Sequence, residues 1–367
     1  MNSCKVAVVG AGLAGLYTAR ALHAAGVDVL LLEGRSRLGG RILTVDDGGT
    51  PSDDGFDLGP SWFWPEMQPA MAELVAELGL DSFIQHSTGD VVFERLSRER
   101  PQRFSPAYEN QQSRRVSGGT GAVVRALAAR LPDERIRLGT QVTAMALRHD
   151  GVELSLRRTD GHTEVLLAEH VVAALPPRLL GASVAFSPAQ DSATATRWRR
   201  TPTWMAPHAK FFAIYDDPFW RKDGLSGTAQ SMVGPMVEIH DSTTKSGRAA
   251  FFGFLGVGAD QRKSVGEVAL KQACIEQLAR LFGQAAMSPR ATLLKDWAAD
   301  PFTATADDRT GGDHPTPVSS RWVSGEWEGR LVMAGSETSP SEPGYLAGAV
   351  VAGKQAVADI LTRLEQK

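Results

Sequence analysis

The stretch Val6-Ala7-Val8-Val9-Gly10-Ala11-Gly12-Leu13-Ala14-Gly15 decides the fold of the N-terminal part of this chain. It predicts a short buried strand, a glycine turn and then a helix. Gly10, Gly12 and Gly15 match the pattern G-x-G-x-x-G. The first glycine permits a tight turn, the second lets backbone N–H groups approach a pyrophosphate, and the third lets the helix lie close to the strand. Phosphates bind at such a helix N-terminus because its free N–H groups and its dipole favour negative charge.

The residues that follow this stretch support a dinucleotide site. The helix is predicted from Leu13 to Ala25, with Gly26 after its end. Residues 27–32 predict a second buried strand, and Glu33 ends it, 18 residues after Gly15. A carboxylate at this place accepts hydrogen bonds from ribose hydroxyls, which a 2′-phosphate would prevent. Strand, turn, helix, second strand and acid together predict a dinucleotide-binding βαβ unit.

The composition is that of a globular protein without a nucleic-acid or membrane partner. The chain has 367 residues, of which 43% are hydrophobic and 22% charged, and its net charge is −3. No apolar run reaches the ~20 residues that a membrane span needs. The first strand begins within about five residues of Met1, which leaves no room for a signal peptide. The two cysteines, Cys4 and Cys274, have neither a disulfide framework nor metal-ligand spacing. We therefore expect a cytoplasmic protein without a metal site; the sequence does not indicate its oligomeric state.

Hydrophobic periodicity and turn residues predict the later elements. Helices are predicted at residues 69–78, 117–130, 265–282 and 345–364. Strands at residues 136–138, 141–148 and 152–158 predict a β-meander, and buried strands follow at residues 169–175, 249–257 and 331–335. The composition changes at Arg197, where a segment rich in aromatic residues begins. This segment predicts a sheet that belongs to a second domain, inserted into the first. The arginine-rich run from Glu94 to Arg115 is typical of a solvated surface.

Ordered landmarks along nearly the whole chain resemble those of the flavin-containing amine oxidases, the family of the monoamine and polyamine oxidases. No single landmark is decisive, but their order is highly specific. In chain order they are the glycine turn with Glu33, Leu38-Gly39-Gly40-Arg41, Asp57-Leu58-Gly59-Pro60-Ser61-Trp62, Ser117-Gly118-Gly119, Val142, residues 171–177, Lys210 before Asp217-Pro218-Phe219-Trp220, Asp296-Trp297, residues 329–338 and residues 343–350.

The resemblance implies an α/β fold of two interleaved domains. A Rossmann-like FAD-binding domain, with a glutathione-reductase-like βαβ unit and a β-meander, is expected from residues 1–65, 115–195 and 300–367. An α+β substrate domain with a mixed sheet is expected from residues 66–114 and 196–299.

The resemblance also implies FAD as the cofactor. Glu33 is expected at the adenosine ribose, Arg41 at the phosphates and Val142 at the adenine. The helix that begins near Tyr345 is expected to direct its N-terminus at the flavin pyrimidine edge, where reduction places negative charge that a helix N-terminus stabilises. The full set of expected cofactor-binding residues is Gly10, Ala11, Gly12, Leu13, Ala14, Gly15, Glu33, Gly34, Arg35, Gly40, Arg41, Gly59, Pro60, Ser61, Trp62, Val142, Gly335, Ser336, Glu337 and Leu346.

Three residues are expected at the reaction centre, again from the resemblance. Lys210 matches the lysine that holds a water beside flavin N5 and helps reduced flavin meet oxygen. Tyr345 matches one wall of the amine cage, where an aromatic face attracts an amine dipole or an ammonium group. Trp297 matches the tryptophan of the Asp-Trp pair.

The chain departs from many members of that family at the second wall of the amine cage. The second tyrosine is expected near Asp307, but residues 304–309 contain no aromatic residue and no cysteine. The cage is therefore either incomplete or completed by Trp62, Trp64 or Trp204. The covalent cysteinyl link of some relatives is absent at this place as well, so FAD is expected to be non-covalent.

The expected reaction is oxidation of an amine. A hydride passes from the α-carbon of the amine to flavin N5, and reoxidation by O2 gives hydrogen peroxide and an imine. Three alternatives stay open. The first is another flavin enzyme on the same fold, which would be a desaturase, a porphyrinogen-type oxidase or a dehydrogenase. The second is a non-catalytic binding protein of the escort-protein type, and the third is a nicotinamide dehydrogenase. The sequence does not distinguish a polyamine, an aromatic amine and an amino acid as the substrate.

Overall fold

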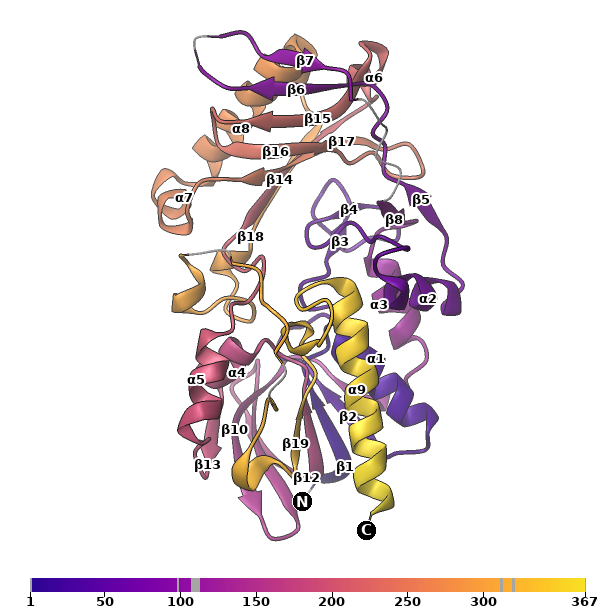
Figure 1. Cartoon of the computed structure of the whole chain (residues 1–367), viewed down its shortest axis with the longest axis vertical. Helices are drawn as coiled ribbons and strands as arrows, with labels where there is room; N and C mark the ends of the chain where they lie inside the picture. The colour runs from indigo at the N-terminus through magenta and orange to yellow at the C-terminus, as the bar shows by residue number, and fades with distance from the viewer. Residues whose placement is uncertain (1, 98, 107–112, 311–312, 319–320, 367) are drawn as a thin grey trace.

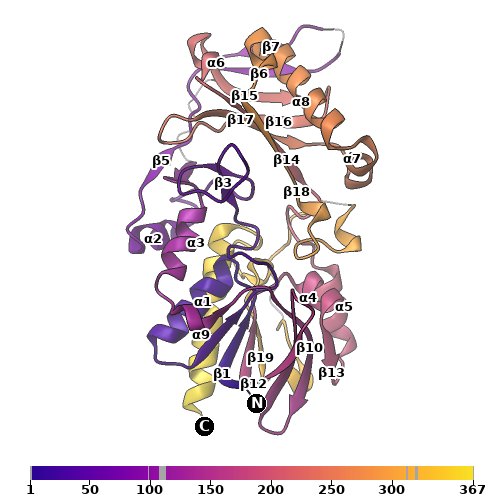
Figure 2. The same ribbon diagram turned by 180° about the vertical axis from the view of Figure 1, so that it is seen from behind.

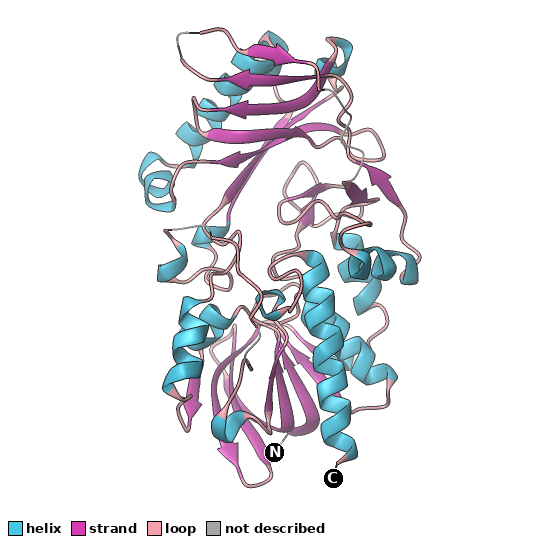
Figure 3. Ribbon diagram, viewed as in Figure 1, coloured by secondary structure: helices cyan, strands magenta, loops and turns pink. Residues whose placement is uncertain are grey.

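Two β-sheets lie at opposite ends of the molecule, with shorter strands and loops between them (Figures 1 and 2). The computed structural model describes residues 2–97, 99–106, 113–310, 313–318 and 321–366. Figure 3 shows that helices cover both sheets. The chain crosses between the two ends several times, so each end contains segments that are far apart in the sequence.

The first sheet has eight strands in the order β13-β10-β11-β12-β1-β2-β9, with β19 also pairing with β12. Its strands are β1 (Asn2–Val9), β2 (Val29–Leu32), β9 (Ile136–Arg137), β10 (Thr140–Arg148), β11 (Gly151–Arg158), β12 (Thr163–Ala173), β13 (Ala185–Ser187) and β19 (Leu331–Met333). Strand β1 pairs in parallel with both β2 and β12. The predicted strand-turn-helix-strand unit is confirmed as β1, α1 (Leu13–Ala24) and β2.

Residues 6–9 of β1 are buried on both faces of the sheet, as this continuous apolar run predicts for a parallel strand. Val6 and Val8 pack in one core, and Ala7 and Val9 pack in another, because alternate side chains point to opposite faces. The first core lies under α1, α2 (Pro69–Glu77), α3 (Gly121–Ala128) and α9 (Leu346–Glu365). The second core includes side chains of α4 (Pro177–Ser183) and α5 (Ser192–Arg200). The central strands therefore carry the loops of the site on a scaffold that is covered on both sides.

The β-meander differs from the prediction in one strand. Strand β9 pairs in parallel with β2 at the far edge of the sheet, not with β10. The meander consists of β10, β11 and β12, which are antiparallel neighbours. The prediction was wrong because Gly139, with φ +59, turns the chain between β9 and β10 and lets them join opposite parts of the sheet.

The second sheet has seven strands in the order β18-β14-β17-β16-β15-β6-β7. Its strands are β6 (Asp90–Glu94), β7 (Gln102–Phe104), β14 (Ala209–Tyr215), β15 (Leu225–Ser231), β16 (Met236–Asp241), β17 (Ala249–Leu255) and β18 (Ala291–Asp296), and the helices beside it are α6 (Phe219–Lys222), α7 (Ala259–Val265) and α8 (Glu267–Phe282). The helix predicted at residues 265–282 is confirmed as α8, which begins two residues later, after Gly266 with φ +83; α7, directly before it, was not predicted.

The two faces of β14 have different neighbours. Phe211, Ala213 and Tyr215 pack with α8 in the outer core. Phe212 and Ile214 point the other way, toward the hairpin of β3 (Thr44–Val45) and β4 (Phe56–Asp57). Alternation along the strand places Lys210 on this inner face, between the two sheets.

The middle of the arginine-rich run is solvated as the sequence predicts, since Arg95, Arg100 and Arg103 are exposed, but its two ends are buried. Glu94 and Arg115, at its two ends, are 2% and 4% exposed. Glu94 pairs with Arg280, and Arg115 donates to the carbonyl oxygens of Ser242 and Thr243. Arg115 belongs to β8 (Arg114–Val116), which pairs with β5 (Ser82–Ile84). Arg98 and residues 107–112, also within this run, lie outside the described residues.

Two general features bear on the kind of protein this is. None of the helices in the described part of the chain combines the length and the hydropathy that a transmembrane segment requires. Within the same residues, no three histidine, cysteine or acidic side chains gather where they could hold a metal ion.

Candidate active site

A cavity of about 930 Å³ lies between the two sheets and receives residues from both. It reaches from the glycine turn after β1 to the inner face of β14, β16 and β17. Most of the expected site residues line it: Gly10, Gly12, Leu13, Ala14, Glu33, Arg35, Gly40, Arg41, Gly59, Pro60, Ser61, Trp62, Lys210, Trp297, Gly335, Ser336, Tyr345 and Leu346.

The glycine turn lets the start of α1 lie against β1. Gly10 has φ +99, a conformation that side-chain-bearing residues rarely adopt. A Cβ atom on Gly15 would lie 1.8 Å from the carbonyl oxygen of Gly10, so only glycine fits there. Gly12 is the N-cap of α1, and the following Leu13 and Ala14 line the cavity. The free N–H groups of this helix start therefore face a space that can hold an anion.

Glu33 fixes the loop next to the glycine turn. Its side chain is 4% exposed, and its two oxygens accept hydrogen bonds from the backbone N–H groups of Ala11 (2.8 Å) and Arg35 (2.9 Å). The carboxylate thus joins the end of β2 to the glycine turn while it still lines the cavity.

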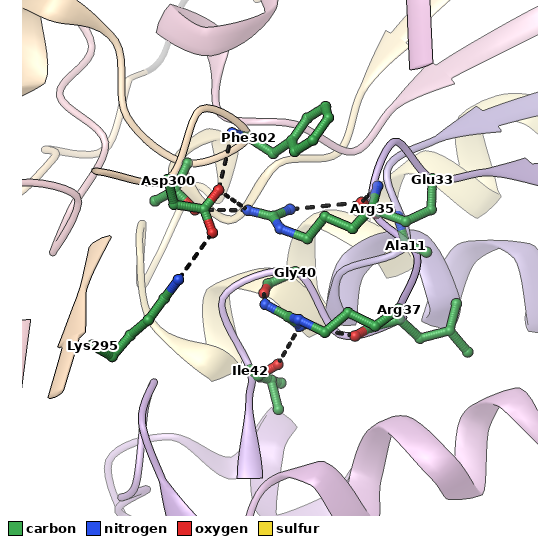
Figure 4. Close-up of polar contacts among 11 residues, drawn as sticks. Ala11, Glu33, Arg35, Arg37, Gly40, Ile42, Lys295, Asp300 and Phe302 are labelled. Carbon is green, nitrogen blue, oxygen red and sulfur yellow. Dashed lines mark hydrogen bonds and ion pairs between the residues drawn. The ribbon is translucent and has the colours of Figure 1, made fainter. Parts of the chain in front are cut away.

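An arginine pair holds the loop after Glu33, as Figure 4 shows. Arg35 donates to Asp300 (2.8 Å), and Asp300 also accepts from Lys295 of β18 (3.2 Å). Arg37 donates to the carbonyl oxygens of Leu38, Gly40 and Ile42. The loop that leads to Arg41 is therefore tied both to itself and to the second sheet.

Arg41 lies on the cavity wall above a buried acid. Its guanidinium forms a two-pronged pair with Glu337, at 2.6 and 3.0 Å, and donates to Ser336 (2.9 Å). Glu337 is fully buried and does not line the cavity, so it acts on the cavity only through Arg41 and Ser336. A fork-shaped pair of this kind fixes the plane of the arginine.

The turn at residues 204–205 is strained and belongs to the cavity wall. Met205 has φ +63, uncommon for a residue with a side chain. Arg41 donates to the carbonyl oxygen of Trp204 (3.2 Å), which holds the turn in place. Both residues of the turn line the cavity.

The structure gives Tyr345 two indole neighbours. The ring of Trp204 lies 4.5 Å from that of Tyr345, and the ring of Trp64 lies 6.3 Å away, both edge-on. Trp62 packs instead against Phe252 (5.3 Å) and His240 (4.8 Å). Among the described tryptophans, those beside Tyr345 are therefore Trp204 and Trp64; the imidazole of His314 also lies 4.9 Å from the Tyr345 ring.

Lys210 is a buried lysine whose hydrogen-bond partners, among the residues that the structure describes, are neutral oxygen atoms. It is 5% exposed, and its Nζ donates to the carbonyl oxygens of Gly59 (2.6 Å) and Asp57 (3.3 Å) and to the hydroxyl of Ser61 (3.0 Å). Burial lowers the pKa of Lys210 from 10.5 to about 7, and the charge of Asp57 opposes that shift. A lysine with such a pKa exchanges its proton near neutrality. Trp297 also binds this loop, through its indole N–H and the carbonyl oxygen of Leu58 (3.0 Å).

Five expected cofactor-binding residues do not line the cavity. Ala11, Gly15, Gly34 and Glu337 lie directly behind residues that do. Val142 packs in the core of the first sheet, next to β11. Its assignment to the adenine stays a prediction.

Several residues on the wall were not expected from the sequence. The ring of Phe302 lies so close to Gly34 that a Cβ atom on Gly34 would be 2.6 Å from it. The guanidinium of Arg35 also lies over the ring of Phe302. Gly34 is the one sign of this contact in the sequence, because a residue with a side chain would collide with Phe302. Met205 and Glu238 also line the cavity, and no local pattern in the sequence indicates them.

Comparison with known families covers almost the whole chain. The family described as flavin containing amine oxidoreductase matches residues 13–113 and 101–361. The chain is 24% identical to a probable flavin-containing monoamine oxidase A of Dictyostelium discoideum, over 98% of each protein. It is also 24% identical to the flavin-containing amine oxidase B of Homo sapiens, over 98% of this chain and 86% of that protein.

Solved structures of two oxidases have the same fold. One is a putrescine oxidase bound to putrescine, with a TM-score of 0.79 and 22% identity over 98% of this chain and 99% of that chain. The other is cyclohexylamine oxidase from Brevibacterium oxydans, with a TM-score of 0.80 and 21% identity over 99% of both chains. At these identities the likeness is evidence for the mixed α/β fold alone.

Proposed function

This chain belongs to the family of flavin-containing amine oxidoreductases, and from that premise we propose that it oxidises an amine with FAD bound non-covalently and with dioxygen as the final electron acceptor. It is an FAD-dependent oxidoreductase that acts on CH–NH groups. The chemistry that FAD supplies when bound is the acceptance of a hydride at N5 from the carbon next to the amine nitrogen, followed by transfer of two electrons to dioxygen, which gives an imine and hydrogen peroxide.

The observation that carries this proposal is a cavity whose walls suit a dinucleotide at one end and an amine at the other. At the first end, Gly10 and Gly15 let the start of α1 pack closely against β1, and this helix start faces the cavity. Leu346 begins a second helix, α9, whose N-terminal residues also line the cavity and favour an anion there. The cavity volume falls in the usual range for a bound cofactor or ligand, about 300–1,000 Å³.

The other end supports the binding of an amine. Tyr345, Trp204 and Trp64 present aromatic surface, which attracts an amine or ammonium group. Lys210 is proposed to hold a water on the inner face of β14, where its Nζ is already oriented by Gly59 and Ser61. We also propose that residues 1–65, 115–195 and 300–367 bind the cofactor and that residues 66–114 and 196–299 bind the substrate. Helix α2 is an exception in packing, because it lies in the core of the first sheet.

The positions of both cysteines support a non-covalent flavin. Cys4 belongs to β1 and Cys274 to α8, both are buried, and neither lines the cavity. Burial raises the pKa of each thiol to about 12, so neither is a thiolate at neutral pH.

Oxygen consumption with a panel of amines tests the proposed function. The purified protein should be yellow, consume oxygen and release an equal amount of hydrogen peroxide with at least one aliphatic or aromatic amine. Flavin reduction by the amine without peroxide would identify another electron acceptor and reject the oxidase. A protein that stays colourless after FAD is added would reject the flavin site itself.

A further inference from the structure

A second cavity of about 290 Å³ adjoins the main one. Trp62, Trp64 and Glu238 line both cavities, so these three side chains form the boundary between them. The other described residues that line the second cavity are mostly polar: Gln85, His86, Ser87, Val91, Pro106, Ser113, Thr228 and His240. We call this space the side cavity. Its polar lining contrasts with the aromatic wall beside Tyr345.

Strand pairing sets the distance between Glu238 and the reaction centre. Lys210 of β14 pairs with Phe254 of β17, and Phe254 pairs with Glu238 of β16. Residues paired in this way point to the same face of a sheet, and neighbouring strands lie ~4.8 Å apart, so the backbones of Lys210 and Glu238 are about 10 Å apart. All three side chains line the main cavity. Glu238 thus lies on the same wall as Lys210, one strand beyond Phe254.

The charge of Glu238 is not balanced by a lysine or arginine. The arginines that line the main cavity, which are Arg35, Arg41, Arg262 and Arg309, pair with acids outside the lining: Asp300, Glu337, Asp296 and Asp260. Arg35 also pairs with one lining acid, Glu33, at 3.6 Å. Among the described lining residues of the two cavities, the carboxylates are Glu33 and Glu238. Glu33 is already bound by two backbone N–H groups. Glu238 is therefore the carboxylate that remains for a ligand.

His240 orients the Glu238 carboxylate through one of its two oxygen atoms and leaves the other without a hydrogen bond from His240. The imidazole Nε2 lies 2.5 Å from Oε1 of Glu238, and the ring of His240 is held between Trp62 and Phe252. Within the described residues, Oε2 of Glu238 has no hydrogen-bond partner, and nearly half of the Glu238 side chain is exposed. The hydrogen bond from His240 holds the pKa of Glu238 below its ordinary value, so the carboxylate is charged at neutral pH.

We propose that Glu238, with the faces of Trp62 and Trp64, binds a second cationic group on the substrate, so that the preferred substrates are linear diamines. This inference rests on the proposed amine oxidation at the far end of the same cavity. The amine that reacts lies beside Tyr345, and the distal ammonium lies at the entrance of the side cavity. A carboxylate and aromatic faces are the groups that bind an ammonium ion.

The test compares diamines with monoamines of the same length. The oxidation kinetics are measured for a series of α,ω-diaminoalkanes and for the matching n-alkylamines, with the flavin-loaded wild type, Glu238→Gln and Glu238→Asp. For Glu238→Gln we expect KM for the best diamine to rise at least about 10-fold with little change in kcat, because a charge-assisted contact is lost. The kinetics with n-alkylamines should stay within about twofold. Glu238→Asp keeps the charge on a shorter side chain, so the best diamine should be about one methylene longer.

A matched control separates this contact from the overall charge of the protein. Glu73→Gln removes the same charge from the exposed surface of α2, where Glu73 pairs with Lys354. It should leave the diamine preference unchanged. Flavin content shows that each variant has folded with its cofactor.

Three results would overturn the proposal. The first is a wild type that does not prefer diamines to matched alkylamines. The second is an equal change for both classes in Glu238→Gln, and the third is a loss of preference in Glu73→Gln. An anaerobic titration that follows the flavin absorbance repeats the comparison without turnover. Equal affinity of the wild type for a diamine and its matched alkylamine there rejects the second site, whether or not oxygen is the acceptor. Failure of the proposed oxidase is recognised separately, by the absence of peroxide with every amine.

Discussion

Lys210 is buried among neutral hydrogen-bond acceptors. This environment should affect both the rate of flavin reoxidation and the pH dependence of protein stability. The Nζ of Lys210 lies 4.4 Å from the ring centroid of Phe252, and no carboxylate of the described residues forms an ion pair with it. Carbonyl and hydroxyl oxygens, aromatic rings and the nearby charge of Asp57 therefore offset only part of the cost of burying the charge.

Lys210→Met should leave FAD bound and slow the reoxidation of the flavin. The methionine fills a similar volume but cannot hold a water, so we expect the rate of the oxygen reaction to fall by about 100-fold or more, the loss typical of a preorganised donor. Stopped-flow mixing of the reduced enzyme with oxygen measures this step. Lys222→Met, which changes an exposed lysine of α6, is the control. An unchanged oxidative rate would show that Lys210 has no part in it.

The lowered pKa of Lys210 should also make stability depend on pH. Between pH 7 and 10.5 the folded state binds fewer protons than the unfolded state, so the free energy of unfolding rises with pH, by at most about 1.4 kcal/mol per pH unit. Below pH 7 the lysine is charged in both states, and the burial cost is fully present. Denaturant unfolding at several pH values should show this slope in the wild type and in Lys222→Met, but not in Lys210→Met. Parallel curves for all three proteins would contradict the assigned pKa.

Glu238 shows why part of the site could not be predicted at the level of the residue. Residues 236–241 have the ordinary composition of a strand, and the pairing of β16 with β17 is irregular between Met236 and Glu238. The side chain that lines the cavity depends on that local shift, which the sequence does not encode in any short pattern.

At the scale of the element, the packing of β1 against α1 depends on Gly15. Gly15→Ala would place a methyl group 1.8 Å from the Gly10 oxygen, so strand and helix must separate. We expect a loss of about 1–3 kcal/mol in the free energy of unfolding, and purified protein with little flavin. Gly329→Ala is the control, because no atom lies within 4 Å of the added methyl group. Full flavin content in Gly15→Ala would contradict the assignment of the glycine turn to the cofactor.

Elements with a strong local signal were predicted well, and elements that depend on distant pairing were not. The helix at residues 13–25 is confirmed within one residue, because its glycine start and its end at Gly26 are both local. Strand β9 was assigned to the wrong partner because residues 136–137 can pair with either edge, and the choice depends on β2, about 100 residues earlier. The burial of Arg115 likewise depends on carbonyl groups at residues 242 and 243, far along the chain.

At the scale of the whole molecule, the proposed non-covalent flavin has a direct test. Acid precipitation of the holoenzyme should leave the pellet colourless and all of the flavin in the supernatant, because the thiols of Cys4 and Cys274 lie outside the cavity. Added FAD should also raise the unfolding temperature of protein from which flavin has been removed, since a ligand that binds only the folded state stabilises it. Flavin that remains with the precipitated chain would show a covalent link.

The tryptophans are distributed in a way that gives the molecule an optical signal. Four of the chain's eight tryptophans, Trp62, Trp64, Trp204 and Trp297, line the main cavity. Indole emission overlaps the near-ultraviolet absorption band of a flavin, so bound flavin should quench the tryptophan fluorescence. The protein without flavin should therefore fluoresce more strongly than the protein with flavin. The protein therefore contains its own probe of occupancy, which reports loading and release in real time without any added label.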